Sequence, residues 1–253
     1  MTTGSAERQR YVARRRERPP GNRVLVGLPL LEQVYAEFMV NFMSLGVPFD
    51  RLIPITAAYV QQAHNEIVRQ ALQRRDWEYL LMLEHDHLLP SNLLQRVAGY
   101  SEPVVGALYF LRRPPHNPCA LIPADGHDDP GTWAGLWEYE RVQWLNPGRT
   151  VQAIEEGRLY RVCAVGMGCT AIRRDVLEAF GAELPFQVPY EGGDLLSDDV
   201  WFCRRAAQLG FEVYLDGGLV LPHLAVRPVH VDTHFEHLER RARELGLVEA
   251  PAG

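Results

Sequence analysis

The stretch Trp77-Glu-Tyr-Leu-Leu-Met-Leu-Glu-His-Asp-His-Leu-Leu-Pro90 decides the fold, because its apolar run breaks abruptly into Glu84, His85, Asp86 and His87. The apolar part is too short and too rich in β-formers for a helix, so it predicts a central strand of a parallel sheet, buried on both faces. Such strands present ligands at their carboxyl ends. Glu84 and Asp86 are two residues apart, so in extended geometry both carboxylates project to one side, where a divalent cation could bind. The stretch alone fits a polar strand-to-helix loop equally well.

Further strands and helices alternate on either side of this stretch. The predicted strands are 23–29, 52–56, 79–83, 103–110, 159–165, 169–173 and 211–215. The predicted helices are 31–45, 60–74, 91–100, 175–180, a segment between an N-cap at Ser197 and a stop at Gly210, and 232–245. This alternation is typical of βαβ units with right-handed crossovers. We therefore expect an α/β fold with a single doubly wound, mostly parallel sheet flanked by helices.

The charge distribution divides the chain into three parts: an arginine-rich arm (1–22), a folded domain (23–225) and a helical tail (226–253). Seven arginines and two glutamates give residues 1–23 a balance of +5, and the remainder carries −11. An acidic body argues against a nucleic-acid partner and means that a polyphosphate ligand would need a metal or a few placed cations. A solvated, disordered tail is the favoured interpretation of the arm, over a contact with an anionic partner.

The cysteines and the hydropathy pattern indicate the compartment. The four cysteines show neither CxxC pairing nor the density of a secreted scaffold, so we expect reduced thiols and a cytoplasmic protein. No apolar run approaches the roughly 18 to 20 residues of a membrane span. Two irregular stretches, 111–152 and 181–196, are rich in proline or glycine and are expected near the functional site, because long loops in compact domains are usually functional.

Three separated features complete the pattern: the Glu-x-Asp pair, the run Val165-Gly-Met-Gly-Cys-Thr-Ala-Ile-Arg-Arg-Asp-Val176, and Asp198-Asp-Val-Trp-Phe-Cys-Arg-Arg-Ala206 followed by Gly210-Phe-x-Val-Tyr-Leu-Asp216 and then His223. In this order they resemble glycosyltransferases of the A-type fold, of the family-2-like group of nucleotide-diphospho-sugar transferases. The resemblance covers about 24–223. The acidic pair alone is weak evidence, whereas the ordered set is specific.

The resemblance implies a metal site. Glu84 and Asp86 stand at the family's Asp-x-Asp motif, which holds Mn²⁺ or Mg²⁺ against the diphosphate of a nucleotide sugar, and His223 stands where a third ligand is usual. A divalent cation stabilises the departing nucleoside diphosphate without a proton. His85 is the spacer between the acids, counted with the donor-binding residues, and His87 is an alternative ligand or sugar contact.

The resemblance also implies a general base at the second acidic pair. Inverting members place the base there, so Asp199 is the better candidate, with Asp198 beside it. If the enzyme instead retains configuration, the pair orients the donor sugar. The structural alternative is that acids in the first turn of a helix only stabilise its N-terminus.

Other positions match segments that contact the donor. Gly166 and Gly168 resemble the turn beside the donor sugar, although a bulge between strands explains them equally well. Pro29 and the pair His64 and Asn65 resemble nucleotide-binding segments, with His64 departing from the arginine common in the family.

Two histidine- and arginine-containing segments remain outside this set. Tyr109, Arg112 and Arg113 close the fourth strand on the expected acceptor side, although surface arginines are usually only solvated. His230, His234 and His237 could meet on a helix face, but a second metal site there is the less favoured interpretation.

The sequence therefore predicts a metal-dependent, hexosyltransferase-like glycosyltransferase that moves a sugar from a nucleotide-diphosphate sugar to the hydroxyl of a glycan, protein or small-molecule acceptor. One alternative is a nucleotidyltransferase, which usually has a glycine-rich basic loop after the first strand; Gly27-Leu-Pro-Leu-Leu-Glu-Gln33 has none. Another is a catalytically inactive nucleotide-sugar or glycan-binding module, against which the four acids at 84, 86, 198 and 199 argue.

Overall fold

The computed structural model describes residues 23–30, 33–123, 142–191, 194–225 and 230–244. The predicted arm (1–22), much of the first irregular stretch (124–141), Gly192 and Gly193, and both ends of the predicted tail (226–229 and 245–253) lie outside the described residues. None of the described helices is both long and apolar enough to cross a membrane.

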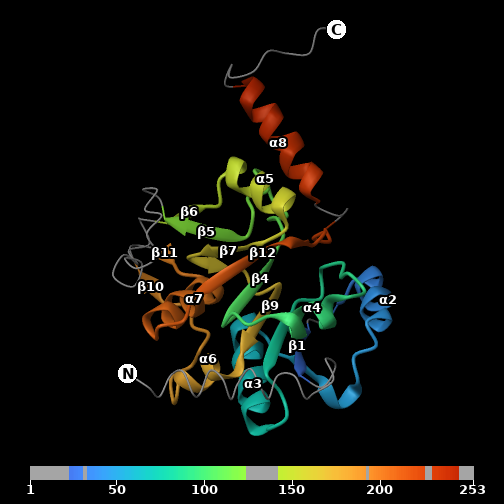
Figure 1. Cartoon of the computed structure of the whole chain (residues 1–253), viewed down its shortest axis with the longest axis vertical. Helices are drawn as coiled ribbons and strands as arrows, with labels where there is room; N and C mark the ends of the chain where they lie inside the picture. The colour runs from blue at the N-terminus through green and yellow to red at the C-terminus, as the bar shows by residue number, and fades with distance from the viewer. Residues whose placement is uncertain (1–22, 31–32, 124–141, 192–193, 226–229, 245–253) are drawn as a thin grey trace.

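A seven-stranded sheet with the order β2-β1-β3-β9-β4-β12-β7 forms the centre of the molecule (Figure 1). Its strands are β1 Val24–Leu30, β2 Leu52–Thr56, β3 Tyr79–Leu83, β4 Val104–Leu108, β7 Leu159–Val162, β9 Cys169–Arg173 and β12 Val213–Val220. β1 pairs parallel with β2 and β3, and β12 pairs parallel with β4. β9 runs antiparallel between β3 and β4, and β7 antiparallel at the edge. Five of the strands consequently point the same way, as the predicted mostly parallel sheet requires.

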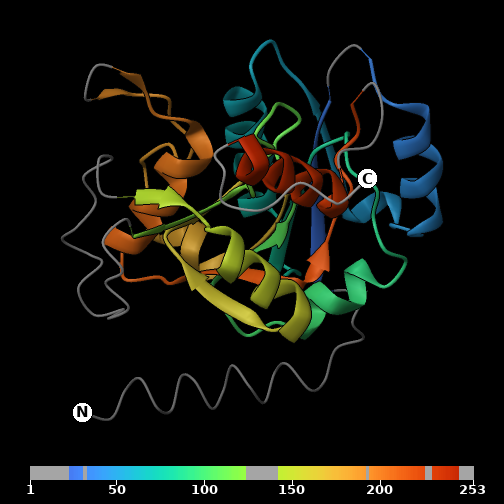
Figure 2. The same cartoon turned by 90° about the horizontal axis from the view of Figure 1, so that it is seen from above.

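Helices cover both faces of this sheet, and α2 and α7 lie on opposite sides of it in both views (Figure 1 and Figure 2). The helices are α2 Ala36–Ser44, η2 Phe49–Arg51, α3 Val60–Gln73, α4 Leu93–Gly99, α5 Pro147–Glu156, α6 Arg174–Ala179, α7 Asp198–Gln208 and α8 Val231–Glu244. Strand β3 shows why two layers are needed. Its five residues are all buried; Leu80 and Met82 join the cluster with α3, α6 and α7, and Tyr79, Leu81 and Leu83 join the cluster with α2 and α4.

The irregular stretches contain short elements that pattern analysis did not separate. A three-stranded sheet is formed by β5 Ala120–Pro123, β6 Val142–Trp144 and β8 Ala164–Val165, and a two-stranded one by β10 Tyr190–Glu191 and β11 Asp194–Leu195. The predicted strand 159–165 is thereby divided, because β7 joins the main sheet and β8 the small one.

The first helix is shorter than predicted. The sequence pattern placed it at 31–45, whereas α2 begins only at Ala36. Residues 33–35 have no helical structure and line the cavity described below. The helical spacing of apolar residues in the sequence therefore continued into residues that line the cavity and are not helical.

Candidate active site

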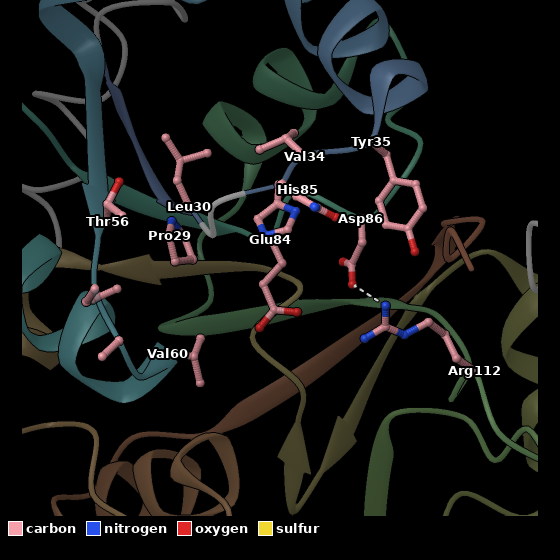
Figure 3. A pocket seen from close by; sticks show the side chains of 14 residues that line it. Pro29, Leu30, Val34, Tyr35, Thr56, Val60, Glu84, His85, Asp86 and Arg112 are labelled. Atoms are coloured by element: carbon pink, nitrogen blue, oxygen red, sulfur yellow. Dashed lines mark ion pairs between the residues drawn. The ribbon is translucent and has the colours of Figure 1, made fainter. Parts of the chain in front are cut away.

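A cavity of about 1150 Å³ opens at the carboxyl ends of β1, β2 and β3 (Figure 3). These strands run parallel, so their ends and the side chains that follow them meet at one edge of the sheet. Its lining comprises Pro29, Leu30, Gln33, Val34, Tyr35, Thr56, Ala57, Ala58, Val60, Ala63, Glu84, His85, Asp86 and Arg112. Four of the predicted site residues thus share one cavity: Pro29, Glu84, His85 and Asp86. The volume of this cavity exceeds the roughly 300–1000 Å³ that is usual for small-molecule sites.

Backbone hydrogen bonds bring Asp86 next to His223, which lies 137 residues further along the chain. The amide of Leu88 donates to the carbonyl of Pro222 at 3.1 Å, and the amide of Leu224 donates to the carbonyl of Asp86 at 2.6 Å. His87 and His223 form an isolated antiparallel bridge. The segments that follow β3 and β12 are therefore held side by side, with Nε2 of His223 3.2 Å from Oδ2 of Asp86.

Asp86, His87 and His223 form a buried cluster whose ligand atoms lie within 4.8 Å of one another. Nδ1 of His223 lies 2.8 Å from the carbonyl oxygen of Phe110. A carbonyl only accepts, so this nitrogen carries a hydrogen, and Nε2 is the ring atom that faces the carboxylate of Asp86. This is the orientation that a second partner imposes on a metal-binding histidine.

Several buried polar atoms of this cluster have no hydrogen-bond partner among the described residues: Oδ1 of Asp86 and both ring nitrogens of His87. Oδ1 of Asp86 lies 3.0 Å from Nδ1 of His87 but outside hydrogen-bond geometry. Buried polar groups are almost always satisfied, so the unpartnered ligand atoms of Asp86 and His87, with His223 beside them, fit a bound cation. The donor set of one carboxylate and two imidazoles suits Mn²⁺ better than Mg²⁺.

Burial and the charges of the cluster shift the pKa values of Asp86 and His87. Burial alone raises the pKa of Asp86, but its contacts with His223 and His87 outweigh burial and hold that pKa well below its usual range. Burial lowers the pKa of His87, which keeps the ring neutral and its lone pair available.

Glu84 lines the same cavity but is not part of the three-residue cluster. Its backbone amide donates to the carbonyl of Gly168 at 2.9 Å. Loss of hydration, followed by the charges of Asp86, Asp199 and Asp198, raises the pKa of its side chain to about 8. The structure therefore brings together two of the three predicted metal ligands, Asp86 and His223, and adds His87, while the four predicted acids act on one another electrostatically.

Arg112, which the sequence placed on the expected acceptor side with a solvated surface arginine as the alternative, lines the cavity. Its Nη1 lies 3.3 Å from Oδ2 of Asp86, and its side chain is about half exposed (Figure 3). It lowers the pKa of Glu84 and so partly offsets the local negative charge. Tyr35 and Thr56 were missed, because nothing in their local sequence distinguishes a cavity wall from a loop.

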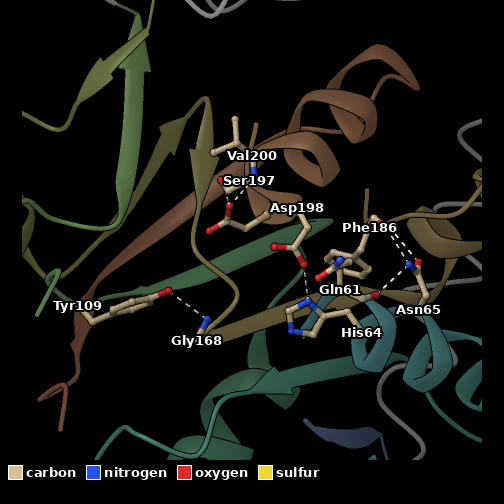
Figure 4. Close-up of polar contacts among 10 residues, drawn as sticks. Gln61, His64, Asn65, Tyr109, Gly168, Phe186, Ser197, Asp198 and Val200 are labelled. Atoms are coloured by element: carbon tan, nitrogen blue, oxygen red, sulfur yellow. Dashed lines mark hydrogen bonds and ion pairs between the residues drawn. The ribbon is translucent and has the colours of Figure 1, made fainter. Parts of the chain in front are cut away.

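The glycine turn at 166–168 is filled by side chains of the same site. A Cβ on Gly166 would collide with the hydroxyl of Tyr109, and one on Gly168 would lie 2.5 Å from Cε1 of His87. The amide of Gly168 donates to the Tyr109 hydroxyl at 3.1 Å (Figure 4). The two glycines are thus required for packing around His87.

The second predicted acidic pair begins α7. Ser197 occupies the N-cap position as predicted, but its hydroxyl accepts no hydrogen bond from a backbone amide of the helix and instead donates to Oδ1 of Asp199. The amide of Val200 donates to the same oxygen at 2.7 Å. In the described part of the chain all hydrogen bonds of Asp199 fall on Oδ1, which leaves Oδ2 free. Burial raises the pKa of Asp199, although its bonds to Ser197 and Val200 oppose this.

His64 and Asn65 contact protein groups that are remote in sequence (Figure 4). Nδ1 of His64 lies 2.8 Å from Oδ2 of Asp198, and both side chains are buried. The side-chain amide of Asn65 donates to the carbonyl of Phe186 at 2.7 Å and accepts from its amide at 3.1 Å. No local pattern could reveal these partners, because they lie 134 and 121 residues away.

His230, His234 and His237 do not form a second group of converging ligand atoms. Among the described residues the one such group is Asp86, His87 and His223. His234 is buried and stacks on Phe110 with ring centroids 4.8 Å apart. The less favoured sequence interpretation, a second metal site, therefore finds no support in the described residues.

Comparison with known proteins gives structural likeness without sequence likeness. No family model matches the sequence, and no curated protein matches it. A197 from STIV superposes with a TM-score of 0.53 at 16% identity, over 80% of this chain and 86% of that one. GalNAc-T7, solved with UDP, GalNAc and Mn²⁺, superposes with a TM-score of 0.51 at 11% identity, over 80% of this chain but only 43% of its own.

These likenesses define the class of fold. The mostly parallel, helix-flanked sheet is similar to that of glycosyltransferases of the A-type fold, to which GalNAc-T7 belongs. The predicted fold class is confirmed.

Proposed function

We propose that this protein is a metal-dependent glycosyltransferase that transfers a sugar from a nucleotide-diphosphate sugar to an acceptor hydroxyl. The observation that carries the proposal is the buried Asp86–His87–His223 cluster, in which Oδ1 of Asp86 and both ring nitrogens of His87 lack hydrogen-bond partners and which borders a large cavity at the carboxyl edge of the sheet. The likeness to GalNAc-T7, solved with UDP, GalNAc and Mn²⁺, supports the choice of donor and metal.

Asp86 and His223 would hold Mn²⁺ or Mg²⁺, with His87 or Glu84 completing the set. The bound cation supplies positive charge to the nucleoside diphosphate as it leaves. Arg112, 3.3 Å from Asp86, can add a second positive charge to the same diphosphate. The acids of the cavity otherwise repel a polyphosphate, so binding requires these cations.

The nucleoside has a largely apolar wall available to it. Pro29, Thr56 and Val60 come from the ends of β1 and β2 and the start of α3. The first backbone amides of α3 have no helical acceptor and favour an anion at that end. His85 lines the same cavity, whereas Asn65 uses its side chain on Phe186.

Asp199 is the proposed base of an inverting reaction. Oδ1 is fixed by Ser197 and Val200, which leaves Oδ2 to accept the proton of the acceptor hydroxyl. Its raised pKa makes it a stronger base than an ordinary aspartate. Glycan, protein and small-molecule acceptors are all compatible with this chemistry.

The test is donor turnover by the purified protein with UDP-, GDP- and dTDP-linked sugars, with Mn²⁺ and with a chelator. Asp86→Asn keeps the shape of the side chain and removes its charge, so we expect turnover to fall by about 100-fold or more. Asp232→Asn makes the same change on α8, where the side chain is 79% exposed, and should leave turnover unaltered.

Four outcomes would contradict the proposal. Full activity in chelator would show that turnover needs no metal ion. Full activity of Asp86→Asn would show that turnover does not depend on the Asp86 cluster. Donor binding without turnover would identify a binding module, and release of diphosphate from a nucleoside triphosphate and a sugar phosphate would identify a nucleotidyltransferase.

A further inference from the structure

A buried polar contact ties α3 to the first turn of α7. Nδ1 of His64 lies 2.8 Å from Oδ2 of Asp198; His64 is 1% exposed and Asp198 8%. Oδ2 of the aspartate accepts, so Nδ1 carries the hydrogen. Figure 4 shows the imidazole of His64 directed at the carboxylate across the space between the two helices.

A second contact reinforces the first. Asn65, the neighbour of His64, exchanges two hydrogen bonds with the backbone of Phe186. The ring of Phe186 contacts the His64 ring at 4.8 Å and stacks on Phe202 of α7 at 4.9 Å. The start of α7 is therefore held against α3 by one polar and one aromatic connection.

The two helices that this contact joins carry different parts of the proposed site. Val60 and Ala63 of α3 line the cavity, and Asp199 follows Asp198 directly on α7. A change at His64 would thus alter the position of the proposed base relative to the donor cavity, without removing a wall of the cavity, because His64 does not line it.

Burying the His64 and Asp198 side chains between two helices costs free energy of hydration. Nε2 of His64 is buried and has no hydrogen-bond partner among the described residues. Replacing a buried ionic or polar pair with packed apolar side chains is often neutral or stabilising, so packing alone does not require a histidine and an aspartate here. A directional contact does fix the orientation of the helix end, which apolar packing does less strictly.

We propose that His64 is a positioning residue: through its hydrogen bond to Asp198 it fixes the first turn of α7, and with it Asp199, relative to the donor cavity. This inference rests on the proposed function, since it assigns Asp199 a partner in transfer. His64 itself touches neither donor nor acceptor in this assignment.

The test compares His64→Asn with His64→Leu. Asparagine can place an N–H near the position of Nδ1, whereas leucine fills the space without a donor. We expect His64→Leu to lower kcat by about 10- to 100-fold, since small displacements of a reacting group have effects of this size. KM for the donor should stay within about twofold, and His64→Asn should recover most of kcat. Arg69→Leu, an exposed change on the same helix, is the matched control and should not alter either constant.

A double-mutant cycle and a measurement without turnover complete the test. If the two side chains act as one unit, Asp198→Asn combined with His64→Leu should lower kcat no more than the worse single change. Hydrogen exchange of amides 198–202 should be faster in His64→Leu than in wild type and His64→Asn.

The results separate the two hypotheses. An inactive wild-type protein whose α7 amides still respond to His64→Leu would overturn the proposed function and retain the contact as a helix-positioning one. An unchanged kcat in His64→Leu, no rescue by asparagine, multiplicative effects in the cycle, or unchanged exchange at 198–202 would each overturn the positioning role.

Discussion

Asp86 and Asp216 are both buried aspartates associated with strands of the main sheet, but their surroundings differ. Asp216, in β12, is 1% exposed and receives two hydrogen bonds from Arg96 at 2.5 and 2.6 Å. The hydroxyl of Tyr100 donates at 2.5 Å and the amide of Gly218 at 2.9 Å. Asp86 is 7% exposed, and its Oδ1 has no hydrogen bond within the described chain.

The difference shows how a structural buried aspartate can be distinguished from one that binds a ligand. Asp216 is saturated by Arg96 of α4, by Tyr100 directly after that helix and by its own strand, so its network is complete without any ligand. Asp86 has instead an Oδ1 without a hydrogen-bond partner, beside His87, whose two ring nitrogens are likewise unpartnered among the described residues. Buried polar atoms without partners are costly, and a bound cation would complete this arrangement.

The largest expected effect on stability follows from Asp216→Asn. This change leaves the guanidinium of Arg96 beside a neutral amide in a largely buried place, which costs about 3 kcal/mol of unfolding free energy. Urea denaturation followed by circular dichroism measures the loss. A loss under about 1 kcal/mol would show that the network is not structural in this sense.

Addition of Mn²⁺ is expected to have a somewhat smaller effect. At about 100 times its Kd, a ligand bound only by the folded state raises the unfolding free energy by about 2.7 kcal/mol, and the melting temperature rises accordingly. Wild type and Asp216→Asn should both show this rise, because both retain the cluster. Asp86→Asn should not; an equal rise in that variant would place the metal elsewhere.

The smallest effect is expected for Asp86→Asn in a chelator. The amide can offer its N–H groups to Nε2 of His223 and to the unpartnered Nδ1 of His87, so stability should change by less than about 1 kcal/mol. The same change thus has different consequences at the two aspartates: at Asp216 it mainly lowers stability, and at Asp86 it mainly lowers activity. A loss at Asp86 comparable to that at Asp216 would remove the distinction.

Much of the fold was readable from local pattern. The apolar run 79–83 became a strand at those residues, because five consecutive β-forming side chains can be buried only between two layers of helices. Pattern failed where a residue's role depends on the site: 33–35 continued a helical period but line the cavity. It failed again where one continuous strand pattern serves two sheets, at β7 and β8.

Within the site, the sequence determined which chemical groups end the strands: Glu84, Asp86 and His87 after β3, and His223 after β12. The tertiary structure decided which of them converge, because backbone pairing across 137 residues sets His223 against Asp86 and brings His87 into the cluster while Glu84 stays in the cavity wall. It also decided that His64 contacts Asp198. Local sequence encodes the direction of a side chain, but only packing of the whole sheet encodes which remote side chain it meets.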